Sequence, residues 1–134
     1  MDRKSTHLAM IRTIIGRMSL GSWLIELWSL LIVSALLVVA ANPAYARFAW
    51  LALFMAIAFW LLDTHVVRQG RLYRKMYDQV RDLEEAHIDF SMDTALAETE
   101  GAAFSSVAFS RALAAFHGVV IAAIAITRTL AHWR

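Results

Sequence analysis

The sequence contains no cysteine, which excludes a disulfide framework, a thiolate zinc site and a thiol nucleophile. One proline and five glycines in 134 residues leave little material for loops, so we expect a mostly helical chain. The sequence also has no glycine-rich phosphate loop, no HExxH motif and no Gly-x-Ser-x-Gly motif. We therefore do not expect an enzyme, a cofactor or a bound metal ion.

Apolar residues, in contrast, make up 60% of the chain, against about 45–50% in typical soluble domains. A small soluble protein exposes much of its surface to water, so this apolar content would create large hydrophobic patches. The composition argues against a water-soluble enzyme and predicts an all-α membrane protein with a single membrane domain over residues 1–134. The net charge of +2 is small, and only the distribution of charge along the chain is informative.

Residues 1–20 are polar and basic, and they predict an amphipathic helix. Leu8, Ile11, Ile15 and Met18 recur at intervals of three and four residues, which places them on one face of a helix. We interpret this segment as a cytoplasmic interfacial helix that lies under the bilayer. A contact helix in an oligomer is the alternative.

Two apolar runs follow and predict a transmembrane helical hairpin. The first span covers residues 23–42, with Glu26 as its one charged residue, and is long enough to cross a hydrocarbon core of about 30 Å. Pro43 ends it, because proline has no N–H for a continuing helix. The second span covers residues 45–63 and ends at Asp63.

Residues 64–101 are the polar part of the chain, and residues 102–130 are apolar again. We expect the second helix to continue unbroken to about Ala86, with Gly70 as a weak point that costs about 1 kcal/mol relative to alanine. The segment 102–130 predicts a third transmembrane helix, with a re-entrant helix as the alternative. The polar part begins with the basic residues Arg68, Arg71, Arg74 and Lys75 and continues with the acidic residues Asp78, Asp82, Glu84, Glu85, Asp89, Asp93, Glu98 and Glu100.

Lysine and arginine gather in residues 1–20 and 68–75, which predicts a cytoplasmic N-terminus in the bacterial inner membrane. The turn 42–47 then lies outside and residues 64–101 lie in the cytoplasm. Arg128 and Arg134 run mildly against this topology. A secretory signal peptide is a competing interpretation of the N-terminal region, but its apolar run is longer than a signal core of about 7–15 residues.

The apolar spans contain a few candidate pore-lining or packing residues. Glu26 is costly in lipid, so we expect it to snorkel to the interface, or to face protein, water or an oligomer axis. The third span carries small residues four apart, a pattern typical of close helix packing in membranes. An overlapping stripe with His117 near its middle would suit either a pore or a packing face. Together these candidates are Glu26, Ser106, Ser110, Ala114, His117, Gly118 and Ala122.

Beyond the second span, cations alternate with aromatic rings. This pattern is typical of a positive-inside anchor that attracts anionic membrane lipid. It would also suit a nucleotide or anion site, with arginine on phosphates and tyrosine stacked on bases. The residues concerned are Arg68, Arg71, Tyr73, Arg74, Lys75 and Tyr77. We also considered Asp63, His65 and Glu26 as a metal site or proton relay, although their spacing matches no known metal pattern.

Several stretches resemble a family of small, largely uncharacterised bacterial membrane proteins. They are His7 to Ile11, Phe59 to Asp63, Gln69 to Arg81 and Ile88 to Asp93, together with Met18-Ser19 and Trp28. The architecture is also similar to SLATT-type effectors and to the membrane effectors of Hailong-type anti-phage systems. That similarity implies an oligomeric membrane protein controlled by a nucleotide signal from a neighbouring nucleotidyltransferase.

Our leading hypothesis is a homo-oligomer, such as a tetramer, that forms a gated pore or ion channel in anti-phage defence. An oligonucleotide, a cyclic nucleotide or a partner protein would control it through the basic residues 68–75. The alternative is a non-conducting scaffold or regulatory subunit of a membrane complex.

Overall fold

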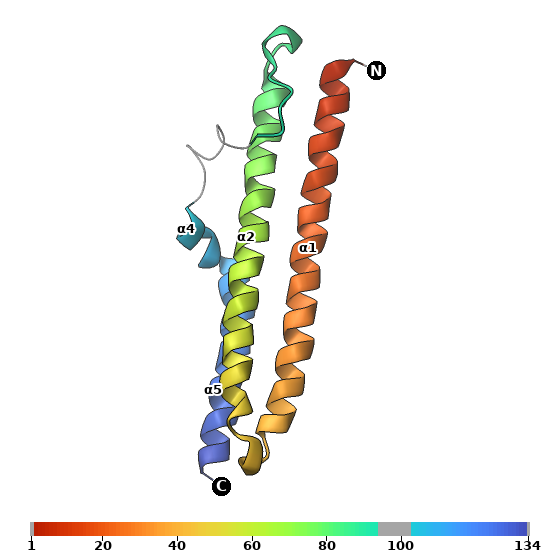
Figure 1. Ribbon diagram of the computed structural model, residues 1–134. Coiled ribbons are helices and arrows are strands. Elements are labelled where there is room, and N and C mark those ends of the chain that lie inside the picture. Colours follow the sequence, from red (N-terminus) through yellow and green to blue (C-terminus); the bar gives the residue numbers. More distant parts are fainter. Residues whose placement is uncertain (1, 94–102, 134) are drawn as a thin grey trace.

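The computed structural model describes residues 2–93 and 103–133, and all regular secondary structure within them is helical, with no strand. Three long helices, α1 (Arg3–Ala40), α2 (Phe48–Asp82) and α5 (Arg111–His132), lie side by side (Figure 1). Each is long and apolar enough to cross a membrane, which agrees with the predicted all-α membrane fold. Short helical turns, η1 (Pro43–Tyr45), η2 (Glu85–His87) and α4 (Phe104–Ala108), occupy the connections.

The helix α1 is continuous, whereas the sequence suggested a separate interfacial helix before the first span. It contains 38 residues, or about 57 Å at 1.5 Å per residue, which exceeds a hydrocarbon core of about 30 Å. No proline interrupts residues 20–23, and Gly21 fits against α2, since a Cβ there would lie 3.6 Å from Val66. The N-terminal turns of α1 therefore pack on α2 as part of the same hairpin, rather than forming an element of their own.

That packing gives the N-terminal end of the hairpin its own small hydrophobic core. Ile11 is fully buried, and it forms one cluster with the buried side chains of Met76, Val80 and Ile88. The apolar face predicted for residues 1–20 thus packs against α2 and against the chain that follows it. The partly buried side chains around this core are Leu8, Ile15, Tyr73, Tyr77, Phe90 and Met92.

The helix α2 runs straight through the end of the second span, as the sequence predicted, but it ends at Asp82 instead of Ala86. Lys4 lies across its end, and its Nζ donates to the carbonyl oxygens of Arg81 at 2.8 Å and Leu83 at 2.6 Å. These bonds satisfy carbonyls that the end of the helix leaves without intrahelical partners. Residues 83–86 do not continue α2 as we expected, and Glu98 and Glu100 lie outside the described residues.

The turn between α1 and α2 is short, as predicted. The Oδ1 atom of Asn42 accepts a hydrogen bond from the backbone N–H of Ala44 at 3.0 Å, and Pro43 begins η1. The second long helix therefore begins at Phe48 and not at residue 45. Asparagine at the cap and proline at the first position are the residues that such a helical start favours.

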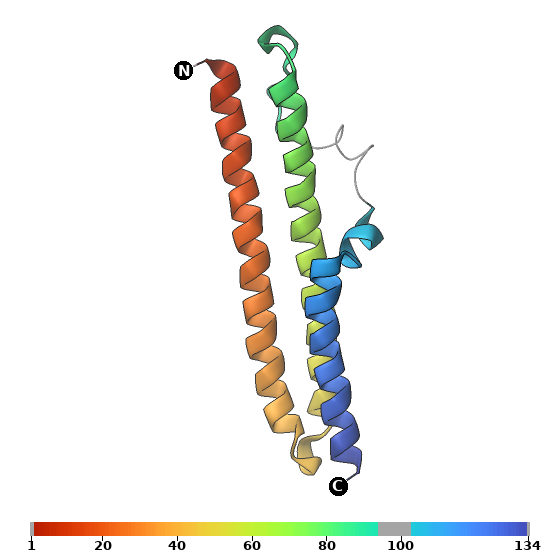
Figure 2. The same cartoon turned by 180° about the vertical axis from the view of Figure 1, so that it is seen from behind.

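The C-terminal segment contains two helices where one was predicted over 102–130. The helical conformation is interrupted between α4 and α5, where the backbone of Ser110 is extended with ψ of 153°. Trp60 of α2 donates its indole N–H to the carbonyl oxygen of Ala108 at 3.0 Å, which satisfies a carbonyl freed by the break. The helix α5 then runs antiparallel to α2 and ends beside the turn (Figure 2). Its 22 residues measure about 33 Å, which is long enough to span.

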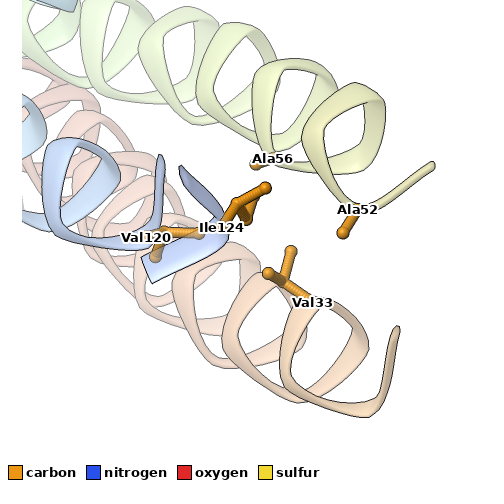
Figure 3. Packing of buried hydrophobic residues seen from close by; sticks show 5 residues of the cluster. All are labelled: Val33, Ala52, Ala56, Val120 and Ile124. Atoms are coloured by element: carbon orange, nitrogen blue, oxygen red, sulfur yellow. The ribbon is translucent and has the colours of Figure 1, made fainter. Parts of the chain in front are cut away.

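The main core lies where the three long helices meet. Val33 of α1, Ala52 and Ala56 of α2, and Val120 and Ile124 of α5 form it (Figure 3). The two alanines are at most 1% exposed and present little side chain, which lets the neighbouring helices approach α2 closely. The small residues of this main core are thus on α2, and the stripe predicted in the third span contributes none of them.

Candidate functional site

A pair of ionisable side chains lies inside the three-helix bundle. The Oδ2 atom of Asp63 on α2 is 2.9 Å from Nε2 of His117 on α5, and the two side chains are 0% and 1% exposed. Asp63 is 15 residues from the start of α2 and His117 is 15 residues from the end of α5, so both lie about 22 Å from the turn end of the bundle. A hydrocarbon core of about 30 Å that begins at the turn would enclose the pair.

The first helix completes the site. The hydroxyl of Ser22 on α1 donates to Oδ1 of Asp63 at 2.5 Å, so both carboxylate oxygens of Asp63 have a partner. Glu26, one turn further along α1, is partly buried and lies within electrostatic range of Asp63 and His117. The three long helices therefore each contribute at least one polar side chain to one cluster, which consists of Ser22, Glu26, Asp63 and His117. We call this set the polar cluster.

Aromatic rings enclose the imidazole of His117. The indole of Trp60 stacks on it with ring centroids 6.0 Å apart and an angle of 13°, and Phe116 meets it edge-on at 5.0 Å. Trp60 also bonds to Ala108, as described above, so one side chain orients the imidazole and holds α4. This arrangement fixes the ring plane and directs Nε2 at the carboxylate.

Several buried polar atoms near the helix contacts have no hydrogen-bond partner among the described residues. They include Nδ1 of His117, Oγ of Ser29 and Oγ of Ser110. Ser22, Glu26 and Ser29 follow one another at intervals of four and three residues and so share the inner face of α1. An unpaired buried polar group costs about 1–3 kcal/mol, so these atoms disfavour a purely structural explanation of the cluster.

The chemistry available to the polar cluster is proton binding. An imidazole and a carboxylate at 2.9 Å form one hydrogen bond, in which the proton is attached either to Nε2 of His117 or to Oδ2 of Asp63. No group of three or more histidine, aspartate or glutamate side chains suited to a metal ion occurs in residues 2–93 and 103–133.

A cavity between α1 and α2 reaches Ser22, at the edge of the polar cluster. It measures about 280 Å³, and Ser22 lines it together with Gly70, Arg71 and Arg74. Gly70 is buried here because α1 passes close by, and a Cβ at this position would lie 3.4 Å from Cβ of Met18. The cavity therefore connects Ser22, and through it Asp63, with two exposed arginines.

The structure brings together only part of the predicted pore-lining or packing set. Ser106 is exposed on α4, Ser110 precedes α5, and Ala114 is partly buried. Gly118 and Ala122 are exposed, so they lie away from the inner face of α5. That inner face consists of Leu113, His117, Val120 and Ile124. The predicted stripe from Ser106 onward does not lie on a single helix.

The predicted nucleotide or anion site lies along one stretch of α2 without surrounding a common centre in this chain. Arg71 and Arg74 are exposed, whereas Arg68 and Lys75 are partly buried. Tyr73 and Tyr77 are also partly buried and pack against the N-terminal core. The hydroxyl of Tyr77 accepts a hydrogen bond from Arg12 at 3.1 Å, so this ring is already engaged within the hairpin.

Sequence reasoning named Asp63, His117 and Glu26 separately but did not pair Asp63 with His117, and it missed Ser22 and Trp60. His65, which we grouped with Asp63, is exposed and outside the cluster. The available signal was that each ionisable residue within an apolar span needs a partner. Comparisons of the chain with protein-family models, with curated proteins and with solved structures found no match.

Proposed function

We propose that this chain is a homo-oligomeric inner-membrane protein that forms a gated pathway for protons or small cations. The polar cluster is the observation that carries this proposal, because it sets a carboxylate–histidine pair and a second carboxylate among apolar helices. An ionised side chain at the centre of a membrane-spanning helix costs about 2.5–3.5 kcal/mol, and such residues typically mark ion pathways and proton relays.

The surroundings of the cluster support a gated pathway over an open one. The cavity that Ser22 shares with the exposed Arg71 and Arg74 gives the cluster an opening between α1 and α2 on the side of these arginines. Toward the turn, Val33, Ala52, Ala56, Val120 and Ile124 close the bundle with apolar side chains. Conduction in this proposal requires these helices to separate. The proposed control by a nucleotide or partner protein in anti-phage defence rests on the sequence resemblance.

Flux into liposomes tests the proposal. The purified chain is reconstituted with a trapped pH-sensitive dye, and a potassium–valinomycin potential drives protons inward. We expect dye acidification with the natural chain and at least a tenfold slower signal with Asp63→Asn. The control Glu85→Gln removes an exposed carboxylate outside the apolar segments and should leave the rate unchanged. Equal rates for the natural chain, Asp63→Asn and empty liposomes would contradict the proposal.

A non-conducting scaffold or regulatory subunit is the second candidate, and the outer face of α5 favours it. Gly118 has open space around it, because a Cβ at this position would have no neighbouring atom within 4 Å. Ala122 is exposed one turn further along α5. Because the chain has no cysteine, Ala122→Cys introduces its only thiol. Val119→Cys is the control, because Val119 is 69% exposed on a neighbouring face of α5. Disulfide-linked dimers of Ala122→Cys but not of Val119→Cys would support the homo-oligomer. Cross-links from Ala122→Cys only to another polypeptide would support the scaffold.

A further inference from the structure

A second cavity lies at the turn end of the bundle, far from the polar cluster. It measures about 620 Å³ and opens between the start of α2 and the end of α5, which lie side by side in Figure 1. This volume is within the range of about 300–1,000 Å³ that is typical of small-molecule sites. Its lining consists of Ala46, Arg47, Trp50, Arg128, Thr129, Ala131, His132 and Trp133.

The lining is basic, and the parts of α2 and α5 that form it contain no aspartate or glutamate. Arg47, Arg128 and His132 contribute nitrogen donors. Residues 27–62 and 103–133 contain no aspartate or glutamate, so the nearest carboxylates along the helices are Glu26 and Asp63. Asp63 is about 22 Å from the start of α2. At a Debye length of about 8 Å under physiological salt, that carboxylate does not compensate the two arginines.

The cations are held in position. The guanidinium carbon of Arg128 lies 4.2 Å from the ring centroid of Trp50, a cation–π contact that spans α5 and α2. Arg47 is the residue that precedes α2, and its side chain makes no capping bond to the helix.

Aromatic side chains place this cavity at the level of lipid head groups. Trp50 is 59% exposed and Trp133 is 85% exposed, and both line the cavity. Tryptophan at the end of a membrane-spanning helix typically lies at the interface between hydrocarbon and water. A site there meets phosphate from lipid at far higher local concentration than any soluble anion.

We propose that this cavity binds the phosphate of an anionic phospholipid head group, with Arg47 and Arg128 as the charged contacts. Guanidinium groups match phosphate oxygens with paired hydrogen bonds, and the tryptophans pack on the glycerol and upper acyl chain. The site also accounts for Arg47 and Arg128, which the predicted topology places on the side of the membrane that is poor in cations. It is independent of whether the chain conducts ions.

Native mass spectrometry of the full chain in detergent, titrated with phosphatidylglycerol, tests this site. Phosphatidylcholine with the same acyl chains and glycerol 3-phosphate are the two comparison ligands. We expect phosphatidylglycerol to bind more tightly than both. At about 1 kcal/mol per charge near a membrane surface, Arg128→Gln should weaken binding roughly fivefold and Arg47→Gln with Arg128→Gln about thirtyfold.

The matched control removes two exposed arginines at the other end of the helices, Arg17→Gln with Arg111→Gln, and should leave this affinity within twofold. Arg128→Lys keeps the charge and should retain more binding than Arg128→Gln even if the contact with Trp50 changes. Equal loss in the two double variants, or equal binding of the two lipids, would overturn the site. Glycerol 3-phosphate that binds as tightly as phosphatidylglycerol would identify a soluble phosphate and overturn the lipid assignment.

Discussion

Asp63 and His117 are 54 residues apart in the sequence, and in the structure Oδ2 of one lies 2.9 Å from Nε2 of the other. This contact joins α2 to α5 at the same level at which Ser22 joins α1 to α2. The pair is therefore the polar link among the three long helices as well as the centre of the proposed function. Its structural and functional contributions have to be measured separately.

We expect His117→Leu to destabilise the protein by about 3 kcal/mol, because it leaves the buried carboxylate of Asp63 with Ser22 as its one hydrogen-bond partner. Adding Asp63→Asn to His117→Leu should recover part of this loss, since an amide carries no charge to leave uncompensated. Unfolding in mixed micelles monitored by circular dichroism measures both variants. Losses for the two single variants that simply add in the double variant would show that the pair is not coupled.

Gly70 faces Met18 across the contact between α1 and α2, and this position tolerates only a small side chain. A Cβ at Gly70 lies 3.4 Å from Cβ of Met18, which is an ordinary contact, so Gly70→Ala should gain up to about 1 kcal/mol of helix propensity. Gly70→Leu should instead separate the helices and lower the free energy of unfolding.

Gly16 is the matched control for Gly70, because nothing lies within 4 Å of a Cβ built there. Gly16→Ala and Gly16→Leu should both stabilise α1, since leucine has nearly the helix propensity of alanine. The comparison uses the same unfolding measurement in micelles. Similar effects of leucine at the two positions would mean that α1 does not approach α2 closely at Gly70.

The start of α1 should depend on pH through Asp2. The backbone N–H of Ser5 donates to Oδ1 of Asp2 at 2.7 Å, and this bond lowers the pKa of the Asp2 carboxyl below its ordinary value. Because the folded state favours the ionised form, the cap is fully formed above the unfolded pKa of about 3.9 and weakens as pH falls through the lower, folded value.

Amide hydrogen exchange over residues 3–8 measures this cap. Asp2→Ala should speed exchange, after correction for the intrinsic rate, most strongly above about pH 4, where the natural cap is fully formed. Asp2→Asn should keep most of the protection but lose its acid dependence, since asparagine caps helices without titrating near pH 4. Unchanged protection in Asp2→Ala would show that the cap does not stabilise these turns.

The sequence was sufficient for the parts of the fold that depend on local patterns. The apolar runs and Asn42-Pro43 located the hairpin and its turn to within a few residues, because span length and proline chemistry are local properties. Pairing Asp63 with His117 requires the register between α2 and α5, and no local pattern contains that register. The same holds for Arg47 and Arg128, which line one cavity because α5 ends beside the start of α2.

Breaks in helices were predicted less well, for a related reason. Neither proline nor glycine marks the interruption at Phe109 and Ser110, which is stabilised by the long-range bond from Trp60 to Ala108. Conversely, the polar residues around 20 suggested a boundary in α1, but a helix that packs on α2 along its whole length needs none. In both cases a tertiary contact decided where the helix continued.

The bond from Trp60 to Ala108 provides the last test, because Trp60→Phe removes the indole N–H donor while keeping an aromatic ring beside His117. We expect about 1 kcal/mol less protection of the amides of α4 against hydrogen exchange in micelles, a roughly fivefold increase in rate, with α5 unaffected. Trp28→Phe is the matched control, since Trp28 is 58% exposed on α1. If the two variants exchange alike over residues 104–110, the break between α4 and α5 does not depend on Trp60.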